Sequence, residues 1–332
     1  MPETRSPFRL LIVGLGLWGQ TLVRSVQGRS GTVRFTGACV RRPDAARAFA
    51  EAQGLDLFDD LSAALAKSGA DGLVVATPHS QHEEHVLTGL KAGVPVFVEK
   101  PLALSTESAA RMFARAEACA LPLSVGFNRR FAPAMIGLRR LVRDGSLGRI
   151  QFIEGNFSGR FGYRYQPDMW RADPQEAPAG GMTPLGIHLI DAMIDLAGPI
   201  TAAATASKRV VLDIDQDDTT SASLRFAGGA LGTLTTLTTT APFWRVQVFG
   251  AEGWAEAQGH ERLLHAPLNG PVTQTRFDPV DIERAELEAF AEAARGGPAF
   301  PVTRDQALQG MAALDAIVSS ADSAGAWVSV ES

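Results

Sequence analysis

The feature that constrains this chain most is an aliphatic run near the N-terminus that ends in spaced glycines. Residues 8–13 are nearly all apolar and lead into Gly14-x-Gly16-x-x-Gly19. Such a run is typical of a strand buried on both faces of a parallel sheet. The glycines predict a tight turn, a close approach of backbone to a pyrophosphate, and a helix packed on the strand. We therefore expect a dinucleotide to bind at this turn, at Gly14, Gly16, Leu17, Trp18 and Gly19.

The alternation of short apolar runs with helical patterns continues to about residue 125. Further buried strands are expected at Val33–Val40, Leu57–Phe58, Leu73–Ala76, Val94–Val98 and Leu123–Gly126. Beyond them, Thr and Ser alternate with aliphatic residues, which is typical of an antiparallel sheet with one exposed face. Helices near 281–294 and 303–323 close the chain. We therefore predict an α/β protein with a doubly wound Rossmann domain over residues 1–125. A substrate-binding and oligomerisation α+β domain with a large, mainly antiparallel sheet is expected over residues 126–332.

The composition excludes several classes of partner. The 332 residues carry a formal net charge of −5, which offers no basic surface to nucleic acid or anionic lipid. No apolar run approaches the ~18 residues of a membrane span. Cys39 and Cys119 lie in apolar stretches and do not suggest a disulfide framework, so we expect a cytoplasmic protein. His79, His82 and His85 do not form the zinc-binding motif His-Glu-x-x-His, so no metal is expected.

The end of the second predicted strand bears on which dinucleotide binds. An acidic residue there would hold the ribose 2′-hydroxyl of NAD, whereas an arginine would accept the 2′-phosphate of NADP. The sequence has Arg41 and Arg42 and no acid before Asp44. A guanidinium forms a charge-assisted contact with a phosphate, so NADP is preferred over NAD. The alternative is that the two arginines are a solvated pair on a loop, which leaves the selectivity open.

A lysine follows the strand predicted at Val94–Val98, in the sequence Glu99-Lys100-Pro101. It therefore lies at the carboxyl end of a strand, where ligands bind in open α/β sheets. The Lys100 ammonium could hydrogen-bond a substrate oxygen. A cationic nicotinamide and partial desolvation would lower its pKa into the range useful for proton transfer. The alternative is a surface Lys-Pro turn.

Several further stretches complete a recognisable pattern. They are Ala76-Thr77-Pro78-His79-Ser80-Gln81-His82, Gly126-Phe127-Asn128-Arg129-Arg130-Phe131, Trp170-Arg171, Gly180-Gly181 and Gly186-x-His188-x-x-Asp191. With the glycine turn and Glu99-Lys100-Pro101, they make the chain from about residue 8 to 325 resemble the Gfo/Idh/MocA family, the group of glucose-fructose oxidoreductase and inositol 2-dehydrogenase.

The resemblance implies a two-domain NAD(P)-dependent oxidoreductase acting on the alcohol of a sugar, cyclitol or cyclic diol, and a homodimer or homotetramer. It also implies that Lys100 is the acid/base beside the nicotinamide and that His188 is its partner. Trp18 is expected near the cofactor, with other residues lining it: Thr77, Pro78, His82 and Glu99. Asn128 and Arg129, from the motif at the domain junction, are expected to bind substrate.

One position departs from the family pattern. Many members carry an aspartate four residues before the catalytic histidine, where this chain has Pro184. Thr183 and Pro184 instead predict the N-cap and first residue of the helix that carries His188. Asp191 lies three residues after His188 and could hold its ring or bind substrate, although helical side chains lean toward the N-terminus.

A loop rich in aromatic and basic residues precedes Gly180. It contains Arg160, Tyr163, Arg164, Trp170 and Arg171. Such a loop could cover the nicotinamide and bind substrate through Arg164, Trp170 and Arg171, with an arginine binding a carboxylate or phosphate of the substrate. A surface or interface loop is an equal alternative.

Two other functions stay open at this point. Pro184 favours a non-catalytic dinucleotide-binding sensor or regulator, whereas the presence of both Lys100 and His188 argues against it. The other is a redox-neutral enzyme whose tightly held NAD oxidises and then re-reduces a sugar.

Overall fold

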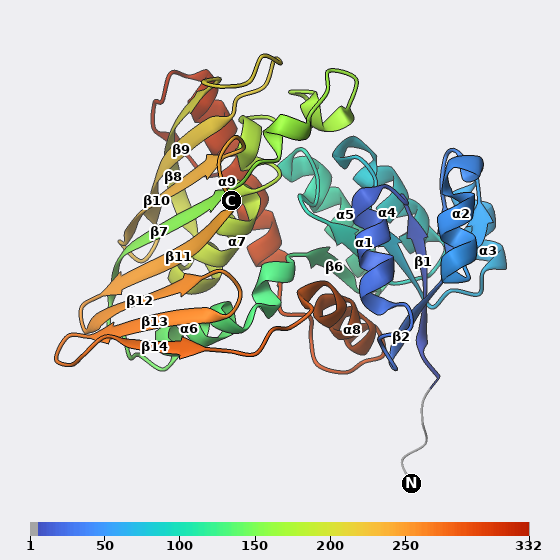
Figure 1. The fold of residues 1–332 in the computed structure, drawn as a ribbon, viewed down its shortest axis with the longest axis horizontal. Coiled ribbons are helices and arrows are strands. Elements are labelled where there is room, and N and C mark those ends of the chain that lie inside the picture. Colours follow the sequence, from blue (N-terminus) through green and yellow to red (C-terminus); the bar gives the residue numbers. More distant parts are fainter. Residues whose placement is uncertain (1–5, 332) are drawn as a thin grey trace, which may run out of the picture. The chain divides into compact units, whose positions relative to one another are not determined.

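A computed structural model describes residues 6–331, and the chain divides into two compact units. The first unit comprises the chain up to Asn128 together with Asp281–Thr303; the second comprises Arg129–Val280 and the chain from Arg304 on. The prediction divided the chain once, after residue 125. The structure differs because the chain returns to the first unit at residues 281–303 (Figure 1).

The first unit is a doubly wound sheet, as predicted. Its six strands pair in parallel in the order β3-β2-β1-β4-β5-β6. The strands are β1 (Phe8–Val13), β2 (Val33–Cys39), β3 (Asp56–Phe58), β4 (Gly72–Val75), β5 (Val96–Glu99) and β6 (Leu123–Gly126). The helices are α1 (Leu17–Val26), α2 (Pro43–Gln53), α3 (Leu61–Lys67), α4 (His82–Lys91), α5 (Thr106–Ala118) and α8 (Ile282–Ala294), with a 3₁₀ turn η1 (His79–Gln81). The strand order reverses between β1 and β4, so ligands are expected at the carboxyl ends of these strands.

Apolar runs explain why this sheet forms. Leu10, Ile12, Val74 and Phe97 have no exposed surface, because helices cover both faces of the sheet. A strand buried on both faces needs a nearly continuous apolar run, and β1, β4 and β5 have one. The core continues into Phe290 of α8, whose ring lies 5.8 Å from that of Phe97.

The second unit contains a nine-stranded mixed sheet in the order β14-β13-β12-β11-β7-β10-β9-β8-β15. Only the pairing of β7 with β10 is parallel among those described. The strands are β7 (Ile150–Ser158), β8 (Ile200–Lys208), β9 (Thr219–Phe226), β10 (Leu231–Leu237), β11 (Phe243–Gly250), β12 (Gly253–Gln258), β13 (Arg262–Pro267), β14 (Thr273–Arg276) and β15 (Val328–Ser329). The helices are α6 (Pro133–Arg143), α7 (Gly186–Ala197) and α9 (Arg304–Asp322), with 3₁₀ turns η2 (Asn128–Phe131), η3 (Gly162–Arg164), η4 (Trp170–Ala172) and η5 (Gly180–Met182). The prediction of a large, mainly antiparallel sheet is confirmed.

The helix that carries His188 begins later than predicted. Its N-cap is Leu185, preceded by η5, and Thr183 does not cap it. The Thr183 hydroxyl instead donates a 2.7 Å hydrogen bond back to the carbonyl oxygen of Pro178. The predicted N-cap at Thr183 and first position at Pro184 are therefore wrong. Over residues 6–331, the helices are too short or too polar to cross a membrane.

Candidate active site

The glycine turn between β1 and α1 has the geometry of a phosphate cradle. Gly14 has φ of +93°, and a Cβ on it would lie 2.5 Å from the carbonyl oxygen of Ala76. A Cβ on Gly19 would collide with the carbonyl oxygen of Gly14, so the fold itself requires both glycines. A Cβ on Gly16 would meet nothing within 4 Å. The packing of the chain does not explain Gly16, whereas the close approach of a pyrophosphate to the start of α1 does.

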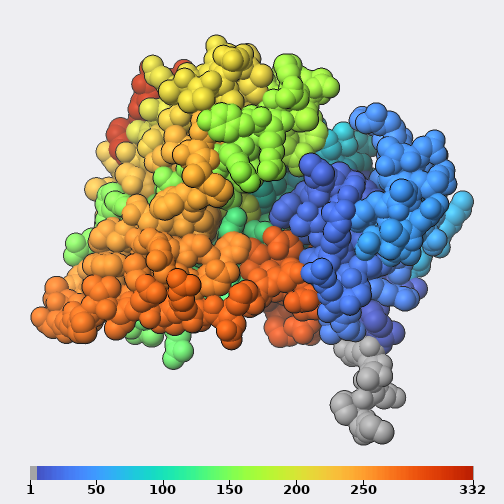
Figure 2. Space-filling model, viewed as in Figure 1, coloured from blue at the N-terminus to red at the C-terminus, as the bar shows by residue number. Residues whose placement is uncertain are grey.

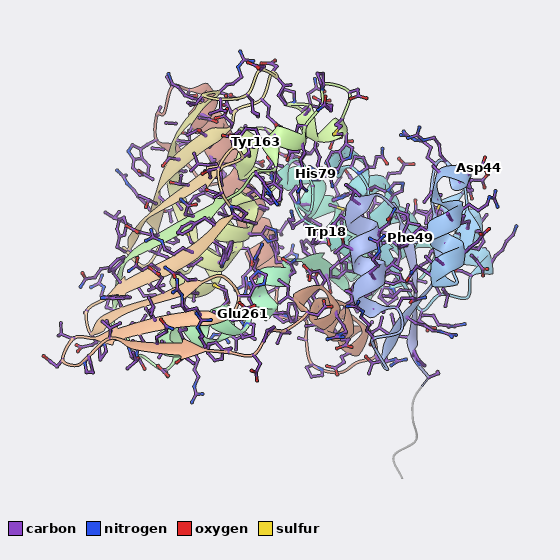
Figure 3. All side chains as sticks on the ribbon, in the orientation of Figure 1. Trp18, Asp44, Phe49, His79, Tyr163 and Glu261 are labelled. Carbon is purple, nitrogen blue, oxygen red and sulfur yellow. The ribbon has the colours of Figure 1, made fainter. Side chains whose placement is uncertain are left out.

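The two arginines predicted to select NADP lie where β2 ends and α2 begins. Both side chains are exposed, and neither has a hydrogen bond or ion pair within residues 6–331. Asp44, the acid that follows, forms an ion pair with Arg47. Figure 3 places Trp18 on α1 and Asp44 on α2, on two helices of the same unit. Arg41 and Arg42 are therefore available to a phosphate.

The carboxyl ends of β4 and β5 carry the next predicted residues. Thr77 and Pro78 follow β4, while Glu99 ends β5 and Lys100 follows it. Because β4 and β5 are neighbours in the sheet, these two pairs come together at one edge, beside the glycine turn after β1. Lys100 is partly buried there. The sheet topology thus assembles most residues predicted to bind cofactor.

His82 lies beneath this edge, because its side chain has no exposed surface. Its Nδ1 lies 3.0 Å from the carbonyl oxygen of Pro101 and its Nε2 lies 3.1 Å from that of Thr77. The ring thus ties the loop after β4 to the turn after β5. Burial lowers the pKa of His82 to about 4, although the carbonyl oxygens act to raise it. A neutral ring donates to only one of the two carbonyls at a time.

The depressed pKa of His82 predicts a pH dependence of stability. The unfolded chain takes up this proton near pH 6.5 and the folded chain only near pH 4, so unfolding is favoured as the pH falls between those values. We expect His82 to account for a loss of about 3 kcal/mol across this window. Urea unfolding at pH 7 and pH 4, which span the window, measures the loss. A His82→Gln variant with the same pH dependence as wild type would contradict the assignment.

Glu99 is also buried, with 5% of its surface exposed. One carboxylate oxygen accepts a 3.3 Å hydrogen bond from the Lys100 backbone N–H. Burial raises the pKa of Glu99 to about 7, against the lowering effects of Lys100 and the Trp18 indole. The indole N–H does not reach hydrogen-bond geometry with any described residue, so we regard the Trp18 effect as weak. Glu99 is thus a buried acid that holds the backbone of Lys100 through a hydrogen bond.

Asn128, predicted to bind substrate, is 5% exposed and its amide donates a 3.0 Å hydrogen bond to Glu283 on the first turn of α8. The amide therefore fastens α8 to the end of β6. This contact was not predicted, because residues 128 and 283 are far apart in the chain.

In the second unit, His188 lies on the first turn of α7 and is 5% exposed. Its ring centroid is 5.8 Å from that of Phe157 at the end of β7, and Phe157 meets Trp244 edge-on at 5.1 Å. The Arg129 guanidinium lies over both aromatic rings, 4.6 Å and 4.7 Å from their centroids. Arg129 also contacts His260, whose pKa is lowered to about 4 by burial and by this cation. An imidazole, a cation and two aromatic faces are thus grouped at one end of the sheet.

Asp191 takes part in a buried ion-pair network. Arg130 binds it with two hydrogen bonds, of 2.7 Å and 2.8 Å, and both side chains are about 2–3% exposed. Arg130 also reaches Asp195 at 2.7 Å, and Asp195 accepts from Arg139. Both carboxylate oxygens of Asp191 are therefore engaged by Arg130. This differs from the expectation that Asp191 holds His188 or binds substrate, and the reason is that α7 turns Asp191 toward η2.

The aromatic and basic loop lies at the surface of the second unit. Arg164 and Arg171 are exposed, and the Arg171 guanidinium stacks 4.1 Å above the ring of Trp170. The Gln216 amide donates a 2.8 Å hydrogen bond to the Arg171 carbonyl oxygen, which joins this loop to the loop after β8. Figure 2 shows the two loops, in green and yellow, side by side on the surface. The arginine head groups remain available to solvent.

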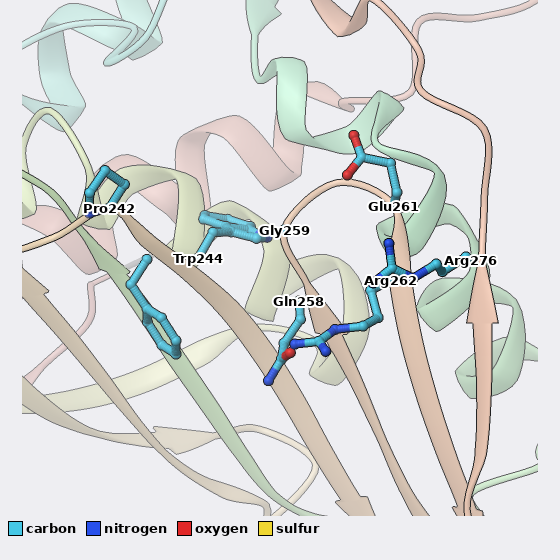
Figure 4. A pocket seen from close by; sticks show the side chains of 8 residues that line it. Pro242, Trp244, Gln258, Gly259, Glu261, Arg262 and Arg276 are labelled. Atoms are coloured by element: carbon cyan, nitrogen blue, oxygen red, sulfur yellow. The ribbon is translucent and has the colours of Figure 1, made fainter.

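The second unit also contains a pocket of about 350 Å³ at the ends of β11 to β14 (Figure 4). Trp244, Phe243 and Pro242 give it apolar walls, and Arg262 and Arg276 give it charge. The remaining lining residues are Gln258, Gly259 and Glu261. Trp244 therefore belongs both to this pocket and to the cluster around His188.

Comparison with known families agrees with this geometry. Residues 8–127 match the oxidoreductase family model described as an NAD-binding Rossmann fold, and residues 135–256 match the GFO/IDH/MocA C-terminal domain. The chain belongs to the Gfo/Idh/MocA family. Because the two matches cover both units in the expected order, the resemblance predicted from the motifs is confirmed.

Two relatives match over most of their own length. The rhizopine catabolism protein MocA of Rhizobium meliloti is 29% identical over 318 residues, which cover 93% of each chain. The D-xylose 1-dehydrogenase (NADP(+)) 2 of Haloferax volcanii is 29% identical, covering 92% of this chain and 95% of its own. A solved levoglucosan dehydrogenase with NADH and levoglucosan superposes with a TM-score of 0.87 at 20% identity, covering 98% of this chain and 100% of that one. At that identity, the structural likeness shows the fold alone.

Proposed function

We propose that the protein is an NADP(H)-preferring dehydrogenase or reductase that acts on a secondary alcohol or ketone of a sugar, cyclitol or cyclic diol. The observation that carries this proposal is Lys100, a partly buried lysine at the carboxyl end of β5, beside the glycine turn. The residues of that edge suit a dinucleotide, and the relatives include dehydrogenases of sugars and inositol.

The roles of the two proton carriers follow from their chemistry. A bound nicotinamide supplies the hydride acceptor or donor. In oxidation, neutral Lys100 removes the hydroxyl proton, directly or through a water; in reduction, its ammonium returns the proton and stabilises oxyanion charge. His188 is the second proposed proton carrier, held against Phe157. Arg129 and Trp244, from the same cluster, are proposed to receive the substrate, with Arg164, Trp170 and Arg171 on the loop above.

The preference for NADPH has a direct test. We expect an Arg41→Ala, Arg42→Ala double variant to lose at least about tenfold in NADPH affinity, because each guanidinium contact with a phosphate contributes about 1.5–3 kcal/mol. NADH affinity should stay the same, and fluorescence titration of both nucleotides measures this.

An Arg47→Ala variant serves as control, because its guanidinium is paired with Asp44. NADH binding that is tighter than NADPH binding in the wild type would contradict the preference. If neither nucleotide binds, a function other than redox catalysis would be favoured.

We also propose that the protein works in the cytoplasm as a homodimer or homotetramer. The two cysteines are unpaired, which suits a reducing compartment. Helices α7 and α9 cover one face of the nine-stranded sheet, and the strand residues of the other face alternate toward solvent, as in β9. That face suits a second copy. Light scattering at several protein concentrations decides the assembly, and a monomer throughout would contradict it.

A further inference from the structure

Glu286, on α8 in the first unit, is an acid in an unusual place. Its side chain has no exposed surface, and neither carboxylate oxygen has a hydrogen-bond partner within residues 6–331. A buried, unpaired carboxylate costs several kcal/mol, whereas a neutral carboxylic acid costs far less. Neither the glycine turn nor the predicted motifs account for this residue.

Three contacts fix the direction of α8 across the sheet. At the carboxyl edge, Glu283 accepts from Asn128; in the middle, Phe290 packs 5.8 Å from Phe97; at the amino edge, Arg295 donates to the Ser6 carbonyl oxygen. The helix therefore runs antiparallel to β5.

This packing places Glu286 next to Glu99. Phe97 and Glu99 lie on one face of β5, about 7 Å apart along the strand. Glu286 and Phe290 lie on one face of α8, one turn or about 6 Å apart. Phe97 and Phe290 are in contact and the two elements run antiparallel. Glu99 and Glu286 are therefore the next facing residues toward the carboxyl end of β5, where Lys100 follows.

The charges around Glu286 are the carboxylates of Glu99 and Glu283 and the ammonium of Lys100. Glu283 already accepts from Asn128. Burial, with both carboxylates adding to its effect, raises the pKa of Glu286 well above its ordinary value, and only Lys100 opposes this. Two ionised carboxylates in this dry space would repel each other, so a single negative charge is favoured.

We propose that Glu286 keeps its proton in the folded protein and acts as a positioning residue: as a neutral acid next to Glu99, it favours the ionised form of Glu99 beside Lys100. One buried negative charge then sets the proton affinity of Lys100. This inference rests on the proposed function in one respect, which is that Lys100 transfers a proton in the reaction.

The proton on Glu286 can be observed without cofactor or substrate. A protonated carboxylic acid has a carbonyl stretch in the infrared that a carboxylate lacks. At about pH 8, above the pKa of about 7 that burial gives Glu99, we expect Glu286→Gln to remove intensity from this band. Glu292→Gln, an exposed glutamate of the same helix, should leave the band unchanged. A band that Glu286→Gln leaves intact overturns the proposal.

The effect on Lys100 is measured in the same ligand-free protein. Acetylation of Lys100 at a series of pH values, quantified by peptide mass spectrometry, gives its pKa, with exposed Lys91 as internal reference. We expect Glu286→Leu to lower the midpoint for Lys100 by about one pH unit, because Glu99 then loses its polar neighbour and takes up a proton.

Glu286→Gln should leave the Lys100 midpoint unchanged, because the amide, like the protonated acid, is a neutral polar group next to Glu99. The positioning role is overturned if the Lys100 midpoint is the same in Glu286→Leu as in the wild type. It is also overturned if Glu286→Leu and Glu286→Gln shift that midpoint equally. A protein that passes both tests but shows no turnover would contradict the proposed function and leave this inference standing.

Discussion

Replacing Lys100 with alanine is expected to lower turnover by ~10²–10⁴-fold, because general acid-base catalysis by a positioned side chain contributes about that much. NADPH affinity should change little, since the glycine turn and the arginines after β2 lie on other parts of the sheet edge. Steady-state kinetics and fluorescence titration of the same preparation separate the two effects.

Lys91, at the end of α4, offers a matched control for this variant. It is exposed, so Lys91→Ala should turn over as wild type does. A Lys100→Ala variant with unchanged turnover would contradict the assignment of Lys100. A variant that loses turnover and cofactor binding together would show that the lysine binds dinucleotide and would leave its proton role without support.

Removing Arg130 should have the largest effect on stability. Its guanidinium is the partner of both Asp191 and Asp195 in a space where all three are almost fully buried. Breaking a buried ion pair by removing one partner costs about 3–5 kcal/mol, because the other charge stays buried without compensation. We therefore expect Arg130→Met to lower the free energy of unfolding by that amount, as measured by urea denaturation.

Arg143 is the control for Arg130. It approaches the same Asp195 at 3.5 Å, but its side chain is 68% exposed. Surface ion pairs contribute about 0–1 kcal/mol, so Arg143→Met should be close to wild type. Equal destabilisation by the two variants would mean that burial of Arg130 does not decide the energetics of the network.

The first unit was predictable because each strand is marked locally. β1 and β5 are mainly apolar runs, and the spaced glycines Gly14, Gly16 and Gly19 follow β1 directly in the sequence. The glycine turn, Thr77 and Lys100 then share an edge as a consequence of strand order alone.

The contacts that the sequence did not predict are those made over long separations. The spacing of Ile282, Glu286 and Phe290 shows that one face of α8 is buried, but it does not show against which sheet. Likewise, Asp191 follows His188 by three residues, which suggests a local pair, whereas Arg130, 61 residues away, binds its carboxylate. Tertiary ion pairs outweigh such local spacing because two charges in a dry interior must neutralise each other.

The proposed function is tested by a screen of sugars, cyclitols and cyclic diols for reduction of NADP⁺ and NAD⁺, followed by the absorbance of the reduced nicotinamide. We expect at least one such alcohol to reduce NADP⁺, faster than NAD⁺, and Lys100→Ala to lose this activity. Tight binding of NADPH with no turnover of any of these alcohols, nor of the corresponding ketones with NADPH, would contradict the proposed function.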